Sequence, residues 1–228
     1  MCPLCTRQPG DMRQGTVGDC WLLAAMAALA EFPEEVEGLF VSQASPETSR
    51  SGQYVVRLFD ARANTMRDIT VDEFVPCIAL KPNQYIRGYE HLAHVPLYAK
   101  PNGDIWSLLV EKAMAKMFGS YAALHGGFEA VAFRALTGCT QQEIWERRGS
   151  TAEWTNEFLV EGSSNRWRQG GLRSGKQAFW QKLVEHTEAH YLVGTSIKQA
   201  ADTGRMVEKR RADGLVEGHA YTLLQVTW

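Results

Sequence analysis

The feature that most constrains this chain is an unbroken apolar run at residues 21–30, which Cys20 opens and a glycine-containing loop precedes. The run is made of Trp, Leu, Ala and Met, and Leu, Ala and Met are strong helix formers. Pro33 cannot donate a backbone hydrogen bond, so the helix is expected to end before it. A helix that is apolar on every face belongs in a core, and this one is too short to span a bilayer. The fold is therefore expected to be built around it.

Cys20 stands at the N-terminal end of that expected helix, directly after Asp19. Asp19 can cap the free N–H groups of the first helical turn. A thiol at the positive end of a helix ionises more readily, and Gly15 and Gly18 leave space in front of the sulfur. Cys20 is therefore a candidate nucleophile. The alternative is that it is a small buried hydrophobe, as most free cysteines are.

The length and composition of the chain suit one large domain or two lobes around a substantial core, because 45% of its 228 residues are hydrophobic. The formal net charge of -2 gives no reason to expect a nucleic acid or an anionic membrane as partner. No apolar segment reaches transmembrane length, and the N-terminus lacks the pattern of a signal peptide. Five cysteines, an odd number, indicate free thiols in a reducing compartment, so we expect a cytoplasmic protein.

A histidine far along the chain completes a pattern with Cys20. Residues 218–221, Gly-His-Ala-Tyr, begin a second apolar segment. A cysteine at a helix start and a distant histidine at a strand start are the two groups that a cysteine protease brings together. Residues 14–23 and 218–221 resemble the two signature blocks of the calpain family of cysteine proteases. Three further segments between them resemble calpain core segments in the family's order: residues 71–76, 105–113 and 119–127.

The resemblance implies an α+β fold of the papain-like cysteine protease type, in two lobes. Residues 1–127 would form a helical first lobe that carries the cysteine. Residues 128–228 would form an incomplete second lobe of antiparallel strands that carries the histidine. Calpains have an asparagine, in an Asn-Pro-Trp setting, after the histidine strand, whereas only nine residues follow His219 and none is asparagine. We therefore expect a truncated chain or an incomplete triad, with additional domains or a regulatory chain beyond residue 228.

The resemblance also implies a function, that of a calcium-dependent intracellular cysteine endopeptidase acting on protein or peptide substrates. Cys20 would be the nucleophile and His219 the base, and the side-chain amide of Gln14 would stabilise the oxyanion. Gly127 and Gly218 would offer backbone hydrogen bonds to an extended substrate. Two alternatives stay open: a non-catalytic calpain-like module that binds peptides or partners, and another papain-like enzyme, such as an acyltransferase.

A first-lobe calcium site follows from the same resemblance. Asp11 and Asp104 occupy positions at which the family has acidic calcium ligands, and the backbone near Leu4 and Thr6 would lie alongside. Carboxylate and carbonyl oxygens are the ligands that Ca²⁺ takes. The residues themselves leave simpler roles open. Asp104 precedes the amphipathic helix expected at residues 106–117 and can cap it, and Asp11 can be a solvated loop residue.

Three other patterns are weaker. Cys2 and Cys5 form a CxxC, but no second ligand pair stands at zinc-site spacing. His186 and His190 are four residues apart, as on one helix face, but the glutamate between them is not placed as in a zinc peptidase. They are expected on a solvated face. The basic residues 209–211 are too few to indicate a nucleic-acid site and suit a loop.

Hydrophobic periodicity predicts the remaining elements. The expected strands are residues 53–59, 66–71, 191–197 and the segment from His219 onward, and a second amphipathic helix is expected up to residue 190. Two regions rich in Gly, Pro or Ser are expected to be mostly irregular: residues 81–103, and residues 153–175 with one short helix.

Overall fold

The computed structural model describes residues 9, 12–41, 52–81, 93–101, 105–147, 149, 153–159, 167–198 and 209–227. Helices and strands are mixed along this part of the chain, in agreement with the predicted α+β class. The helices are α1 (Cys20–Leu29), α2 (Pro33–Gly38), α3 (Trp106–Phe118), the 3₁₀ helix η3 (Tyr121–Leu124), α4 (Glu129–Thr137) and α5 (Lys176–Glu188).

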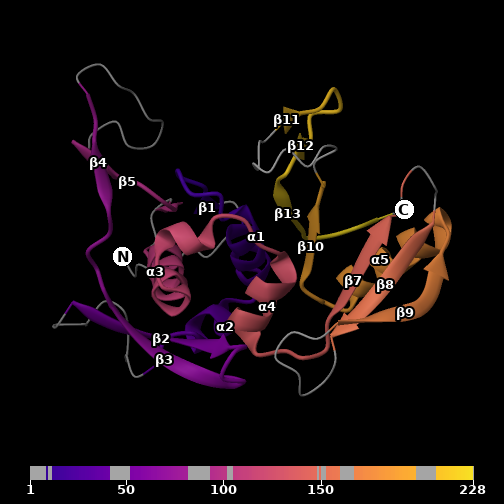
Figure 1. Cartoon of the computed structure of the whole chain (residues 1–228), viewed down its shortest axis with the longest axis horizontal. Helices are drawn as coiled ribbons and strands as arrows, with labels where there is room; N and C mark the ends of the chain where they lie inside the picture. Colours follow the sequence, from indigo (N-terminus) through magenta and orange to yellow (C-terminus); the bar gives the residue numbers. More distant parts are fainter. Residues whose placement is uncertain are drawn as a thin grey trace.

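Helix α1 lies at the centre of the fold, with α3, α4 and the strand β13 (Ala220–Leu223) around it (Figure 1). Every residue of α1 is buried, which confirms the prediction of a core helix. Trp106, Met114 and Leu109 of α3 are likewise almost fully buried and belong to the same hydrophobic core. The apolar run at residues 21–30 therefore sets the architecture, because the other elements must cover it on all sides.

Strands β2 (Gln53–Asp60) and β3 (Thr65–Asp72) form the predicted antiparallel hairpin, with Tyr54 opposite Val71. The buried residues of β2 alternate with exposed ones, so one face packs on the core. The strands extend further than predicted, and the loop is only residues 61–64. Asn64 takes a left-handed backbone conformation there, with φ of 52°, which asparagine tolerates better than most residues.

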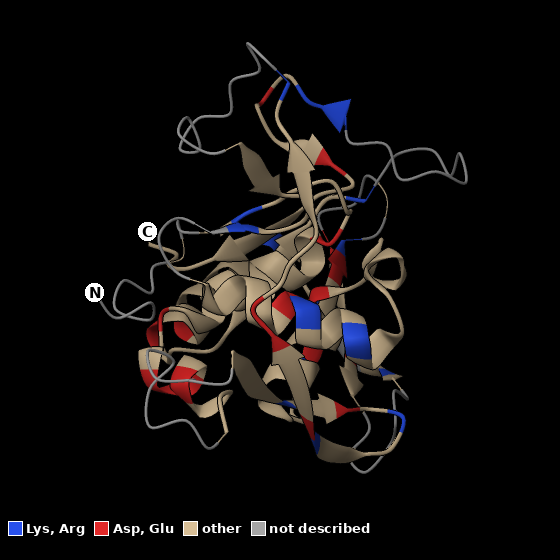
Figure 2. Cartoon of the chain, turned by 90° about the vertical axis from the view of Figure 1, so that its left-hand side faces the viewer, with Lys and Arg blue, Asp and Glu red and all other residues tan. Residues whose placement is uncertain are grey.

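Helix α3 is fixed to this hairpin by two lysines. Lys112 donates to the carboxylate of Asp72, and Lys116 donates to the carbonyl oxygen of Thr70 at 2.8 Å. In Figure 2 the basic residues of α3 lie close to acidic residues rather than in a separate basic patch. The lysine side of α3 therefore faces the hairpin and solvent, while its apolar side faces α1.

The region predicted to be mostly irregular, residues 81–103, contributes one strand to each of two short antiparallel pairs. β4 (Cys77–Ala79) pairs with β5 (His94–Pro96), and β1 (Met12–Arg13) pairs with β6 (Lys100–Pro101). The prediction missed them because each strand has only two or three residues, too few for a periodicity.

The prediction that residues 153–175 are mostly irregular, with one short helix, is wrong. Strands β7 (Glu143–Arg147), β8 (Trp154–Leu159) and β9 (Trp167–Ser174) form an antiparallel sheet in that order. Helix α5 packs on it through Phe179, whose ring stacks on Trp154 with centroids 3.9 Å apart. The tryptophans that looked like loop residues are strand residues, because a large aromatic side chain suits a half-buried sheet surface.

Strand β10 (Val193–Ser196) pairs with β13, placing Ser196 opposite Ala220. The last strand stops at Leu223, earlier than the alternation in the sequence predicted. The backbone N–H of Val226 instead donates to the Thr187 hydroxyl at 3.3 Å, so the chain turns from β10 toward the end of α5. A further short hairpin, β11 (Lys209–Arg210) with β12 (Val216–Glu217), lies in the region predicted as loop.

Helix α4 lies directly after the predicted lobe boundary at residues 127 and 128. Its Ala132, Ala135 and Leu136 are buried in the core that contains α1. The division into lobes at this position stays a prediction.

Candidate active site

The loop that leads into Cys20 is held on one side by residues 97–98. The Thr16 backbone N–H donates to the carbonyl oxygen of Leu97 at 3.0 Å. A Cβ at Gly15 would lie 1.8 Å from the carbonyl oxygen of Tyr98, so only glycine fits there. Gly15 was expected to leave space in front of the Cys20 sulfur, but the space beside it is filled by the backbone of Leu97 and Tyr98.

On its other side the loop is held by the segment after η3. The Gly18 backbone N–H donates to Nδ1 of His125 at 3.2 Å, and the Gly126 backbone N–H donates to the Gly18 carbonyl oxygen at 2.8 Å. The residue immediately before Asp19 is therefore bound through both its donor and its acceptor. Two segments from different parts of the chain thus fix the approach to Cys20, which is the kind of rigid support that a catalytic group requires.

Trp21 connects the cysteine helix to the same segment. Its indole Nε1 donates to the carbonyl oxygen of Leu124 at 2.9 Å, and its ring lies where a Cβ at Gly127 would be, 2.4 Å from the nearest ring atom. Gly127, the predicted substrate-binding residue, therefore lies against the residue that follows Cys20. A side chain at position 127 would displace the indole.

Asp19 does not cap α1 with its side chain, contrary to the prediction. Its carbonyl oxygen accepts the Leu22 and Leu23 backbone N–H groups at 2.9 and 3.1 Å, so the helix begins on its backbone. The carboxyl group points inward and is fully buried. It lies within hydrogen-bonding reach of the Glu111 carboxyl group on α3, which explains why it is not available to the helix N-terminus.

Glu111 lies on α3 and is only 1% exposed. The Ala99 backbone N–H donates to both of its carboxylate oxygens, at 3.0 and 3.2 Å. Burial, followed by the neighbouring Asp19 carboxyl, raises the pKa of Glu111 to about 9. Burial also raises the pKa of Asp19. No sequence signal marks Glu111, because a glutamate next to a buried stripe is normally solvated.

The strand that follows His219 lies along the cysteine helix. The Thr222 hydroxyl donates to the carbonyl oxygen of Ala24 at 2.6 Å, and Ala220 is buried in the same cluster as Cys20. His219 is three residues before Thr222, and Cys20 is four residues before Ala24. The structure thus brings together the elements that carry the two predicted catalytic residues. The His219 ring also contacts the Tyr221 ring edge-on, with centroids 5.0 Å apart.

Gln14 lies at the start of the cysteine loop and is bound to it. Its side-chain Nε2 donates to the carbonyl oxygen of Val17 at 2.8 Å. An amide nitrogen has two hydrogens, so one such bond orients the group and still leaves a second donor. This orientation beside the loop is compatible with the predicted oxyanion role.

Gly218, the second predicted substrate-binding residue, has a left-handed backbone conformation with φ of 73°. Its N–H donates to the carbonyl oxygen of Ile197 at 2.8 Å, which joins the turn before His219 to the segment after β10. Because this N–H is already bound, the backbone group of Gly218 that could bind an extended substrate is its carbonyl oxygen.

Asp11 and Asp104, the predicted calcium ligands, lie outside the residues that the structure describes, as do Cys2 and Cys5. Within the described ranges, no group of three or more His, Cys, Asp or Glu side chains could hold a metal ion. His186 and His190 do not share a helix face, because α5 ends at Glu188 and His190 has a left-handed φ of 58°.

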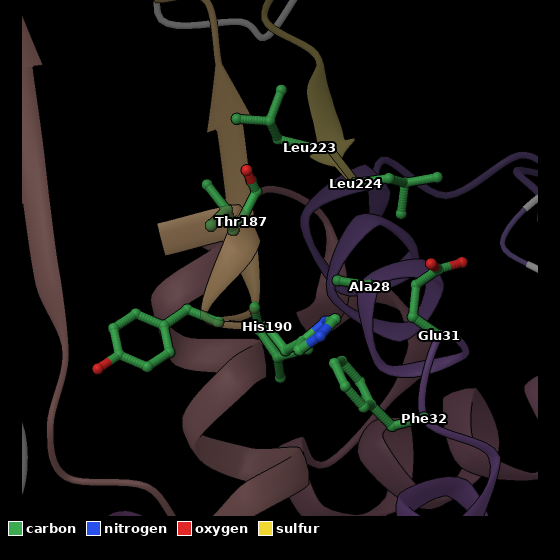
Figure 3. Close-up of a pocket in the computed structure, with 10 residues that line it drawn as sticks. Ala28, Glu31, Phe32, Thr187, His190, Leu223 and Leu224 are labelled. Atoms are coloured by element: carbon green, nitrogen blue, oxygen red, sulfur yellow. The ribbon is translucent and has the colours of Figure 1, made fainter. Parts of the chain in front are cut away.

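A pocket of about 250 Å³ lies at the opposite end of α1 from Cys20. Figure 3 shows Ala28, Glu31 and Phe32 on one side of it, and His190 and Leu223 on the other. Ala28 is eight residues beyond Cys20, or about 12 Å along a helix. The pocket is therefore separate from the candidate active site.

A cysteine at the start of a buried helix and a histidine at the start of the strand packed along it define a class, the cysteine proteases. Sequence comparison identifies the family. Residues 4–228 match the pattern of the calpain family cysteine proteases. The chain belongs to this family.

Curated relatives carry the same family name. The chain is 30% identical over 220 residues to the calpain-type cysteine protease DEK1 of Arabidopsis thaliana, covering 96% of the chain and 8% of that protein. It is 31% identical over 220 residues to mouse calpain-5, covering 95% of the chain and 29% of that protein. Calpain-A of Drosophila melanogaster is 26% identical over 216 residues, with 95% and 21% covered. The chain thus spans less than a third of the length of each of these relatives. No helix in the described part of the chain is long and apolar enough to cross a membrane.

Proposed function

We propose that this chain is the catalytic core of a calcium-dependent, cytoplasmic cysteine endopeptidase, with Cys20 as nucleophile and His219 as base. The observation that carries the proposal is the hydrogen bond from Thr222 to Ala24, which ties the histidine strand to the cysteine helix. Membership of the calpain family supports it, and the relatives' names describe cysteine proteases.

The proposed reaction is peptide-bond cleavage in two steps. The Cys20 sulfur bonds to the scissile carbonyl carbon while His219 takes the thiol proton and passes it to the leaving amine, as the C–N bond breaks. Water then attacks the thioester, its proton goes to the cysteine sulfur by way of His219, and the acid product leaves. The Gln14 amide and the start of α1 would stabilise the oxyanion in both steps.

Substrate binding would use backbone rather than side-chain recognition. Gly127 lies against Trp21, which follows Cys20, and Gly218 immediately precedes His219, so each glycine is next to a neighbour of a proposed catalytic residue or to the residue itself. Backbone contacts of this kind take up an extended peptide as an added strand. We therefore expect the substrates to be proteins or peptides that bind in an extended conformation.

Calcium would be held by Asp11 and Asp104. Asp11 directly precedes β1, and Asp104 follows β6 by three residues. Because β1 and β6 pair antiparallel with Met12 opposite Pro101, the chain enters β1 and leaves β6 at the same end of the pair. This topology suits a site made from both segments, and two carboxylates with backbone carbonyls suit a hard cation. The ion would supply positive charge that joins the two segments.

A substrate-like covalent probe tests the proposal. A short peptide ending in a chloromethyl ketone, added with calcium, is expected to alkylate Cys20, as read by peptide mapping. His219→Ala is expected to slow the reaction at least tenfold, whereas Cys139→Ala, which removes an exposed cysteine, leaves it unchanged. Modification of Cys77 or Cys139 in preference to Cys20 would contradict the assignment.

A further inference from the structure

Two acidic side chains are buried together directly behind the candidate nucleophile. The Asp19 carboxyl group is fully buried, and Glu111 is 1% exposed. Within the described part of the chain, neither carboxylate oxygen of Asp19 has a hydrogen-bond partner. A protonated Glu111 carboxyl group is the donor within reach. Glu111 in turn accepts only from the Ala99 backbone there.

Two carboxylates cannot both be ionised in such a place. Each charge would be removed from water, and the two would repel each other at short range. Binding one proton neutralises one of the two carboxylates and resolves both difficulties. The protonated carboxyl group can then donate a hydrogen bond to its ionised neighbour. Such a bond between an acid and a carboxylate is short and strong.

We propose that Asp19 and Glu111 share one proton and that this pair positions Cys20. Glu111 donates its proton to an Asp19 oxygen, while its other lone pairs accept from Ala99. The inference rests on the proposed role of Cys20 and adds two positioning residues to it. Neither residue reaches the substrate.

The pair acts on Cys20 through one peptide bond and one helix turn. The Asp19 carbonyl oxygen accepts the first two N–H groups of α1 that return to it, from Leu22 and Leu23. Anchoring the Asp19 side chain to α3 therefore fixes the position of the first turn of α1 and of the thiol on it. The same anchor reaches the loop through Ala99, which follows the segment bound to Gly15 and Thr16.

Other titratable groups surround the pair. His125 faces Asp19 from the segment after η3, and its Nδ1 is occupied as an acceptor for Gly18. Tyr121 of η3 lies near Glu111, and burial together with the Glu111 charge raises the pKa of its phenol. Lys112 is adjacent in sequence but is bound to Asp72 on the hairpin side.

Infrared spectroscopy of the carboxyl C=O stretch tests the shared proton without depending on catalysis. At pH 7 the wild type is expected to show a protonated-acid band that disappears as the pH rises through about 9. Glu111→Gln is expected to lack it, and the exposed control Glu34→Gln to keep it. Asp19→Asn is expected to lack it too, because the asparagine amide can donate to an ionised Glu111. A wild type without the band, or its persistence in Asp19→Asn, would overturn the shared proton.

Cys20 alkylation, measured relative to the exposed Cys139, tests the positioning. At pH 7.5 Glu111→Gln is expected to stay within about twofold of the wild-type ratio, because the amide keeps both hydrogen bonds. Glu111→Asp, one methylene shorter, cannot reach both Asp19 and Ala99 and is expected to lower the ratio about fivefold or more. An unchanged ratio in folded Glu111→Asp would overturn the positioning role. If that variant does not fold, a Glu111→Gln ratio far below wild type would overturn it instead. A wild type in which Cys20 shows no preference would defeat the proposed function, whereas the infrared result would still decide the shared proton.

Discussion

At the scale of single residues, the buried Glu111 contributes stability only while it is protonated in the folded protein. Glu111 has a pKa raised to about 9 in the fold, against an ordinary value of 4.5. Between these two values the folded protein binds a proton that the unfolded chain has released. The stability that this group contributes is therefore complete below about 4.5 and declines as the pH rises toward 9.

The first prediction follows from this pH dependence. Glu111→Gln has no titrating group at position 111, so its free energy of unfolding is expected to rise relative to that of the wild type as the pH rises from 5 to 9. The gain is expected to be on the order of 1 kcal/mol per pH unit, which corresponds to one linked proton. Urea unfolding of both proteins at several pH values measures it. A difference that does not change with pH would show that Glu111 is ionised in the folded protein.

Sequence reasoning located the residues whose chemistry is visible in their type and spacing. Cys20 and His219 are predicted because each begins an apolar element, and the structure packs those two elements together. Glu111 and Thr222 could not be found in this way. A glutamate beside a buried stripe and a threonine in a strand have ordinary solvated roles, and only the tertiary contacts to Asp19 and Ala24 distinguish them.

At the scale of elements, the contact between α1 and β13 joins the two elements that carry the proposed catalytic residues. Their polar link is the Thr222 hydroxyl on the Ala24 carbonyl oxygen. Thr222→Val has the same shape but no hydroxyl, so it is expected to lose about 1 kcal/mol of stability and to slow Cys20 alkylation. Thr222→Ser, the matched control, keeps the hydroxyl and is expected to retain most of the alkylation rate. Equal alkylation rates in wild type and Thr222→Val would show that this hydrogen bond does not affect the reactivity of Cys20.

Element prediction succeeded where periodicity was long and failed where it was short or polar. Helices α1 and α3 and the β2–β3 hairpin were predicted because their apolar spacing persists over eight residues or more. The β7–β8–β9 sheet was missed because its inner face is made of scattered aromatics among polar residues. The last strand was predicted too long, because the tertiary bond from Val226 to Thr187 ends it.

At the scale of the whole molecule, the proposed calcium site would join the chain before β1 to the chain after β6. Binding to the folded state alone adds about 2.7 kcal/mol of stability at a hundredfold excess over Kd. Calcium is therefore expected to raise the melting temperature, and both Asp11→Ala and Asp104→Ala are expected to abolish the increase. Asp213→Ala, at an exposed aspartate paired with Arg211, serves as the control and is expected to leave it unchanged. A melting temperature indifferent to millimolar calcium would remove Asp11 and Asp104 as calcium ligands.

Cys20 is proposed to be a nucleophile activated by His219, and competition among Cys20, Cys77 and Cys139 for a limiting alkylating reagent tests this proposal. Cys77 and Cys139 are exposed, whereas Cys20 is only 6% exposed, so simple accessibility favours the first two. Limiting iodoacetamide at near-neutral pH, followed by mass spectrometry of each cysteine peptide, is expected to label Cys20 first. His219→Ala is expected to remove that preference while leaving the labelling of Cys77 and Cys139 unchanged. Labelling in the order of exposure, with no effect of His219→Ala, would contradict the account.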